Sequence, residues 1–316
     1  MNLLGQPARV GRHCGSHVYD ITRDVVDFYA EALDDHHPLY AELAPPLLHH
    51  SECYKVLGEW YLKNLFGNLH ARQDWELFAP IAIGSRVRTR STIVDRYSKR
   101  GRDYVVNETD LMDAGDGRLL VRGRTHQSFL PPKERGASKG HGPGGEPPSS
   151  LPRSEPQASE AEFVVDERTA AQKEAREPRA PFPTAKGREL PAVHKKVDQR
   201  RCWMFSGPGA NYHTDVEQAR KLGFPNIVVQ GMMSTCFAAQ VMLDAFGRGF
   251  LEGGRMSLKL TNVLWVDEAV TARGRVRERT PEGTGTRVHC EVWVDKDDGT
   301  RILLGDASAL DAGDVR

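Results

Sequence analysis

Hydrophobic and polar residues alternate along this chain with two different periods. Over Ser51–Phe66, apolar and aromatic residues recur at helical spacing, which predicts an amphipathic helix. Two stretches that follow it, 69–98 and 100–130, instead alternate residue by residue, which predicts long β-strands. The turn sequence Ala-Gly-Asp-Gly before Arg118 predicts a hairpin between the last two strands.

The same order of elements is predicted a second time, later in the chain. Met232–Phe246 is apolar on all sides, which predicts a buried helix. Alternating stretches follow over 254–280 and 287–310, and Asp-Asp-Gly marks the hairpin between the last two strands. The repeat lies in the pattern and not in residue identity.

A single helix wrapped by a long antiparallel sheet is the hot-dog arrangement. We therefore predict an α+β tandem hot-dog, with two antiparallel sheets that each wrap a central helix. One half alone leaves a sheet edge exposed, whereas two halves can join their edge strands into one continuous sheet. The tandem is then a covalent version of a dimer.

A segment rich in glycine, proline, serine and charge separates the two halves. It spans residues 132–187 and includes Ser-Lys-Gly-His-Gly-Pro-Gly-Gly, with few bulky apolar residues. Such a composition buries too little surface to offset the entropy of ordering, so we predict a linker, with a short helix over 163–175. The predicted domains are residues 1–131, a degenerate and noncatalytic half, and residues 188–316, the half that carries the candidate site.

Composition excludes several classes of function. Lys plus Arg and Asp plus Glu number 43 each, so no net field favours nucleic acid or an acidic membrane surface. The apolar stretches are too short to span a bilayer, and the N-terminal residues lack the apolar core of a secretory signal. The five cysteines are scattered and never spaced as Cys-x-x-Cys, which indicates reduced thiols and a cytoplasmic protein.

Candidate chemistry is concentrated between Phe205 and Met233. The pattern predicts a strand-like entry to Phe205, a turn rich in glycine and proline, and then His213. Asp215 is the predicted N-cap of a short helix over Val216–Leu222, which Gly223 ends. An apolar run leads from there to the start of the buried helix.

This segment resembles the MaoC-like (R)-specific enoyl-thioester hydratases and dehydratases. That family carries an aromatic residue, a small residue and Gly, then Asp-x-Asn-Pro-aliphatic-His, a small residue six positions later, and a Gly at the start of the core helix. The matching residues here are Phe205-Ser206-Gly207, His213, Ala219 and Gly231. The first half also resembles the family's noncatalytic half, because Asp35 and Pro38 are present but Tyr40 replaces the His.

Two positions of the motif differ from the family pattern. Pro208 stands where the family has its Asp, and Ala210 stands where it has its Asn, although Asn211 is the next residue. Either Asn211 holds the reacting water, or another acid orients His213. Asp215 and Asp35 are the candidates for that acid.

The resemblance implies a reaction that adds water reversibly to 2-enoyl thioesters, or removes it from (R)-3-hydroxyacyl thioesters. His213 would act as base and acid in turn, Asn211 would hold the water, and the Gly231 N–H would receive the developing oxyanion. Asp215 remains a candidate for the catalytic set. The expected substrate-binding residues are Tyr212, Gln230, Arg220 and Lys221. The two basic residues would meet the phosphates of coenzyme A, or simply form a solvated helix face.

Neither a cofactor nor a metal is expected beyond the coenzyme A or acyl-carrier thioester of the substrate. His36-His37 and His49-His50 are adjacent pairs without a completing set of acidic or cysteine ligands. Two alternatives remain open: a hot-dog thioesterase, in which water attacks the carbonyl carbon, and a noncatalytic acyl-binding subunit. A homodimer is also compatible with the sequence.

Overall fold

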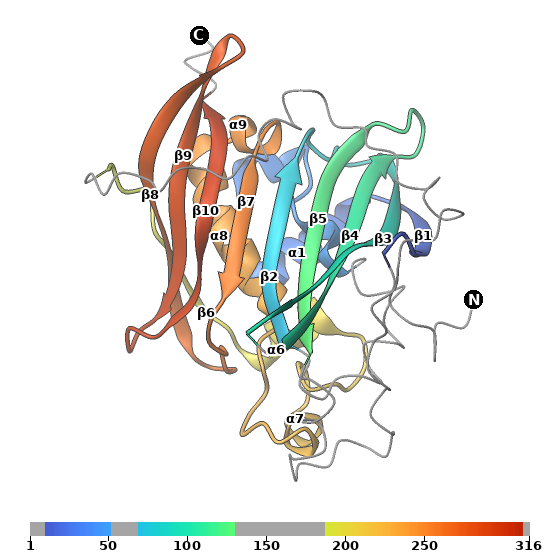
Figure 1. The fold of residues 1–316 in the computed structure, drawn as a ribbon, viewed down its shortest axis with the longest axis vertical. Helices are drawn as coiled ribbons and strands as arrows, with labels where there is room; N and C mark the ends of the chain where they lie inside the picture. The colour runs from blue at the N-terminus through green and yellow to red at the C-terminus, as the bar shows by residue number, and fades with distance from the viewer. Residues whose placement is uncertain (1–9, 52–68, 101, 130–186, 312–316) are drawn as a thin grey trace.

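The computed structural model describes residues 10–51, 69–100, 102–129 and 187–311, and places their strands in one ten-stranded antiparallel sheet (Figure 1). The strands of the first half are β1 (His13–Asp20), β2 (Leu69–Leu77), β3 (Arg86–Lys99), β4 (Arg102–Asp113) and β5 (Leu119–Phe129). Those of the second half are β6 (Val193–Lys196), β7 (Arg255–Leu260), β8 (Ala269–Glu282), β9 (Gly285–Lys296) and β10 (Arg301–Asp311).

The strand order shows that the chain is a tandem of two equivalent halves. It runs β1-β3-β4-β5-β2-β7-β10-β9-β8-β6, so each strand of the first half has a counterpart at the mirrored position of the second. The halves meet where β2 pairs with β7, with Trp75 opposite Met256. The predicted joining of two edges into one continuous sheet is therefore confirmed.

Glycines in the left-handed region form the two predicted hairpins. Gly117 has φ 77° in the turn between β4 and β5, and Gly299 has φ 85° between β9 and β10. Asp298 accepts a hydrogen bond from the backbone N–H of Thr300 at 2.8 Å, which supports the second turn. Both turns confirm the prediction from Asp-Gly signals.

The central helix of the second half is α8 (Gly231–Phe246), in agreement with the predicted buried helix. Its buried residues occupy all sides of the helix, since it lies between the sheet and the first half. The core-facing residues of β9 alternate along the strand as Val288, Cys290, Val292 and Val294, each at most 1% exposed. The helix predicted over Ser51–Phe66 in the first half lies almost wholly outside the described residues, as does the predicted linker.

Two further helices connect the halves. Helix α1 (Arg23–Leu33) begins at the N-cap Thr22 and packs against α6 (Gln199–Ser206) of the second half. Arg200 lies 2.8 Å from Glu31, and Arg201 lies 3.0 Å from Asp34, which links the two helices by ion pairs.

The strand-like entry predicted before Phe205 is wrong, because these residues form α6. Asp198 accepts a hydrogen bond from the N–H of Arg201 at 2.8 Å and so caps the helix. Cys202 and Phe205, three residues apart, then share the buried side of the helix. A stretch of eight residues fits both the helical and the strand spacing of apolar residues, and the Asp198 cap selects the helix.

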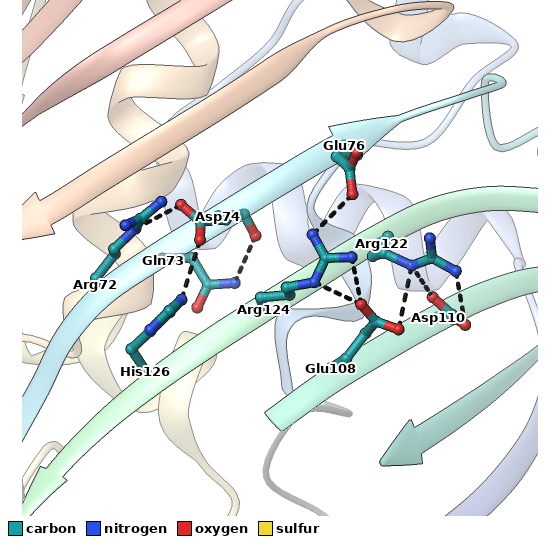
Figure 2. A network of polar contacts seen from close by, with 9 residues as sticks. All are labelled: Arg72, Gln73, Asp74, Glu76, Glu108, Asp110, Arg122, Arg124 and His126. Carbon is teal, nitrogen blue, oxygen red and sulfur yellow. Dashed lines mark hydrogen bonds and ion pairs between the residues drawn. The ribbon is translucent and has the colours of Figure 1, made fainter. Parts of the chain in front are cut away.

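The first half carries a network of charged residues on β2, β4 and β5 (Figure 2), and the strand register puts it on the sheet face opposite Trp75. Arg122 is 2% exposed and donates to Asp110 at 2.6 and 3.2 Å, while Arg124 contacts both Glu76 and Glu108. A second group lies beside it, in which Arg72 on β2 and His126 on β5 both bond Asp74. Removing one member of a buried ion pair leaves the charge of its partner uncompensated. Such a network therefore stabilises the sheet only when every member is present.

The remaining described helices are short: η1 (Pro38–Ala41), η2 (Leu48–Ser51), α7 (Val216–Lys221) and α9 (Arg248–Leu251). Cys14, Cys202, Cys236 and Cys290 are all buried free thiols, as expected for reduced core residues. No helix in the described part of the chain is long and apolar enough to cross a bilayer.

Candidate active site

The loop that carries His213 runs from the end of α6 to the start of α8. Asp215 accepts a hydrogen bond from the N–H of Gln218 at 2.9 Å and caps α7, as predicted. Gly223 follows α7 with φ 85°, the conformation expected of a residue that ends a helix. Val228 then bridges to Trp265, which holds the return segment beside the sheet.

The imidazole of His213 is oriented by a backbone carbonyl. Its Nδ1 lies 2.7 Å from the oxygen of Val228. Because a carbonyl oxygen only accepts, Nδ1 must carry the proton of the neutral ring. The lone pair is therefore on Nε2, which is the form that can accept a proton from water or from carbon.

Desolvation keeps this half-buried ring neutral. Removal from water lowers the pKa of His213 to about 4, against a smaller opposing effect of the bond to Val228. The ring of Tyr212 lies beside it, with centroids 3.8 Å apart. Burial likewise raises the pKa of Tyr212 to about 12, so its hydroxyl stays protonated.

Asn211 uses both ends of its side-chain amide to shape the loop. Its Oδ1 accepts from the backbone N–H of His213 at 2.8 Å, and its Nδ2 donates to the carbonyl of Ser206 at 3.1 Å. Buried Thr214 adds to the same turn through its hydroxyl, which bonds the Gly209 carbonyl at 2.9 Å. The structure thus gives Asn211 a role in fixing the path of the loop, and its predicted role in holding water is not tested.

The start of α8 lies next to this loop. Gln230 precedes the helix, and its Oε1 accepts from the hydroxyl of Ser206 at 2.8 Å. Within the described residues, the N–H groups of Gly231 and Met232 donate no hydrogen bond, as is usual for the first turn of a helix. These groups can receive negative charge on a substrate oxygen.

Gly231 is closely packed at the junction of the two halves. A Cβ atom on this residue would lie 2.4 Å from Cδ2 of Leu260 on β7 and 3.4 Å from Nδ1 of His70 on β2. Both a packing role and the predicted oxyanion role are compatible with this position. His70 belongs to the first half, so the site lies at the seam between β2 and β7.

The two predicted phosphate-binding residues lie on α7. Arg220 is exposed and forms an ion pair with Glu217 at 2.8 Å, and Lys221 is also exposed. Their contact with coenzyme A remains a prediction.

The degenerate motif of the first half is at a different place. The hydroxyl of Tyr40 donates to Oδ2 of Asp35 at 2.8 Å, and both residues are buried. They line a small cavity together with Ala239 and Gln240, which lie more than two turns along α8 from Gly231. Asp35 therefore pairs with Tyr40, and the partner that orients His213 is the Val228 carbonyl.

Sequence reasoning missed the roles of Val228 and of the Ser206 hydroxyl. A backbone carbonyl has no signature in the sequence, because every residue has one. Ser206 stood out only as the small residue of the family motif. The residues brought together by the structure are Ser206, Asn211, Tyr212, His213, Val228, Gln230 and Gly231.

Comparison with solved structures shows the class of fold. A protein described as a MaoC-like dehydratase superposes with TM-score 0.70 at 19% identity, over 96% of this chain and 98% of that one. A MaoC-like dehydratase from Phytophthora capsici gives 0.64 at 14% identity, over 95% and 96%. A conserved hypothetical protein of Mycobacterium tuberculosis, described as having a double hotdog fold, gives 0.56 at 14%, over 96% and 99%.

This chain therefore has the α+β double hot-dog fold, as the sequence pattern predicted. Neither a scan against protein-family models nor a search of the curated proteins gives a match.

Proposed function

We propose that this protein is a MaoC-like enzyme that hydrates 2-enoyl thioesters and, in reverse, dehydrates (R)-3-hydroxyacyl thioesters. The observation that carries the proposal is the orientation of His213, whose Nδ1 is held by the Val228 carbonyl so that Nε2 presents a lone pair. The structural neighbours described as MaoC-like dehydratases support the same reaction class. The substrate would be an acyl thioester of coenzyme A or of an acyl carrier protein, and no other cofactor is needed.

The geometry suggests how the atoms move. His213 Nε2 takes a proton from water, whose oxygen forms a bond to the β-carbon of the enoyl thioester. The π electrons shift toward the α-carbon and the thioester oxygen, where the N–H groups at the start of α8 stabilise the charge. His213 then returns the proton to the α-carbon, so that H and OH have been added overall.

The proposal is tested by following the absorbance of short, medium and branched 2-enoyl thioesters. Wild type should consume them, and His213→Ala should be slower by about 100- to 10,000-fold, the range for loss of a general acid–base. His194→Ala is the matched control, because His194 lies on β6 and bonds Thr271 outside the site. Its rate should equal that of wild type.

Two other results would change the assignment. Release of free thiol, with no hydration of the enoyl double bond, would indicate a thioesterase. Binding of acyl thioesters without any turnover would indicate an acyl-binding subunit, for which Pro208 and Ala210 in place of the family Asp and Asn are the reason.

A further inference from the structure

The two motif positions 210 and 211 offer no amide that is available to a substrate. Ala210 has no polar side chain, and both ends of the Asn211 amide bond backbone groups at 2.8 and 3.1 Å. An oxygen that reacts at His213 Nε2 still needs a donor to hold it in line. The donor must therefore come from a residue other than these two.

Gln230 is placed to supply it. Its Oε1 accepts from Ser206 Oγ at 2.8 Å, which fixes the amide and turns its two N–H bonds away from Ser206. Among the described residues, Nε2 of Gln230 donates no hydrogen bond, and the side chain does not cap α8. The amide is thus oriented by one end while the donating end remains available.

A closed set of contacts places this amide in the same site as His213. Ser206 bonds Gln230 through its hydroxyl and Asn211 through its carbonyl. Asn211 bonds the N–H of His213, and His213 bonds Val228, two residues before Gln230. Val228 holds the imidazole, and Gln230 carries the amide. The two groups therefore lie at opposite ends of the short segment 228–230, which spans at most about 7 Å.

We infer that Gln230 holds the reacting oxygen, with Nε2–H donating to the water in hydration and to the 3-hydroxyl in dehydration. In hydration the water accepts from Gln230 and donates its own hydrogen to His213 Nε2. In dehydration the 3-hydroxyl accepts from Gln230 and receives the proton of His213 Nε2 as it leaves as water. Ser206 acts as a positioning residue, because it reaches the substrate only through Gln230. This inference rests on the proposed function, and it names the group of the substrate that the site recognises.

Binding tests the inference without turnover. Calorimetry would compare (R)-3-hydroxyacyl-CoA with saturated acyl-CoA of the same length, in short and medium chains. Wild type should bind the hydroxylated member about tenfold more tightly, the effect of one hydrogen bond. Gln230→Glu keeps the acceptor for Ser206 but removes the donors, so this preference should vanish while the affinity for saturated acyl-CoA is unchanged. Gln230→Leu should do the same.

Gln199→Leu is the matched control, because Gln199 is a nearby amide whose Nε2 bonds the Thr214 carbonyl at 3.2 Å. It should keep the tenfold preference. Ser206→Ala should lower kcat with little change in KM, and Ser206→Thr, which restores a hydroxyl, should recover it.

Three results would overturn the inference. If Gln230→Glu weakens both ligands equally, the amide serves the thioester carbonyl and not the hydroxyl. If the Gln230 variants behave as wild type while His213→Ala is inactive, the proposed function stands and this inference falls. If wild type binds neither thioester, the proposed function itself fails, and the inference with it.

Discussion

The residues of the site show how much of a histidine's chemistry depends on its surroundings. A family acid is replaced by Pro208, yet His213 still has a partner for Nδ1 in the Val228 carbonyl. Asp215, a candidate for that partner, instead caps α7. The sequence predicted the cap because the residue type and the following helix are both local, whereas the carbonyl contact joins residues that only the folded loop brings together.

Histidines whose pKa values are lowered by desolvation make the stability of the fold depend on pH. Desolvation lowers the pKa of His49, His70 and His213 to about 4 each, below the usual value near 6.5. Between these two values the unfolded chain binds more protons than the folded one, so stability falls as pH drops from about 6.5 to about 4. Above pH 6.5 these residues are neutral in both the folded and the unfolded chain, so they add nothing to the dependence of stability on pH.

We predict that His49→Phe reduces this slope. His49 is fully buried, and removal of one such residue should lower the slope by up to about 1.4 kcal/mol per pH unit. Urea unfolding at a series of pH values, compared with His194→Ala at an exposed position, measures the change. An unchanged slope would mean that His49 is protonated in the folded state.

At the scale of elements, long elements with one clear period were predictable, and among the short ones α7 was predictable through its cap and its terminal glycine. The helix Met232–Phe246 and both Asp-Gly hairpins follow from the sequence. Strands β1 and β6 were missed, since neither has a sustained alternation of apolar residues. The entry to Phe205 was misread because eight residues fit both periods, and the deciding contact is the Asp198 cap.

The charge network on β2, β4 and β5 predicts a large cost for breaking one pair (Figure 2). Arg122→Met leaves the buried carboxylate of Asp110 with Arg90 as its remaining partner, so the free energy of unfolding should fall by about 1–3 kcal/mol. Arg220→Met removes an exposed pair on α7 and should cost less than about 1 kcal/mol. Urea unfolding distinguishes the two. Equal effects would show that burial of the network is energetically unimportant.

For the whole molecule, the repeated order of elements was enough to predict the fold, and the pairing of β2 with β7 makes the two halves one structure. The position of the site at this seam was harder to foresee. It depends on the close approach of residues far apart in the sequence, such as His70 and the start of α8. Only the residues carried by one continuous motif could be named beforehand.

The shared sheet predicts that the halves unfold together. Arg122→Met lies in the first half, yet it should lower hydrogen-exchange protection of β9 in the second half as much as that of β4. Mass spectrometry of exchanging peptides measures both regions in one sample. Loss of protection confined to the first half would show that β2 and β7 separate before either half unfolds.

The single-chain sheet also has a consequence for how this protein can change over time. In a homodimer every substitution is written into both subunits, so neither can lose a function that the other keeps. Here the first half carries Tyr40 bonded to Asp35, where the second carries His213. Because one gene encodes both halves, each half can accumulate substitutions separately. One half can then lose its catalytic residues and keep a structural role, while the other half keeps its own catalytic residues.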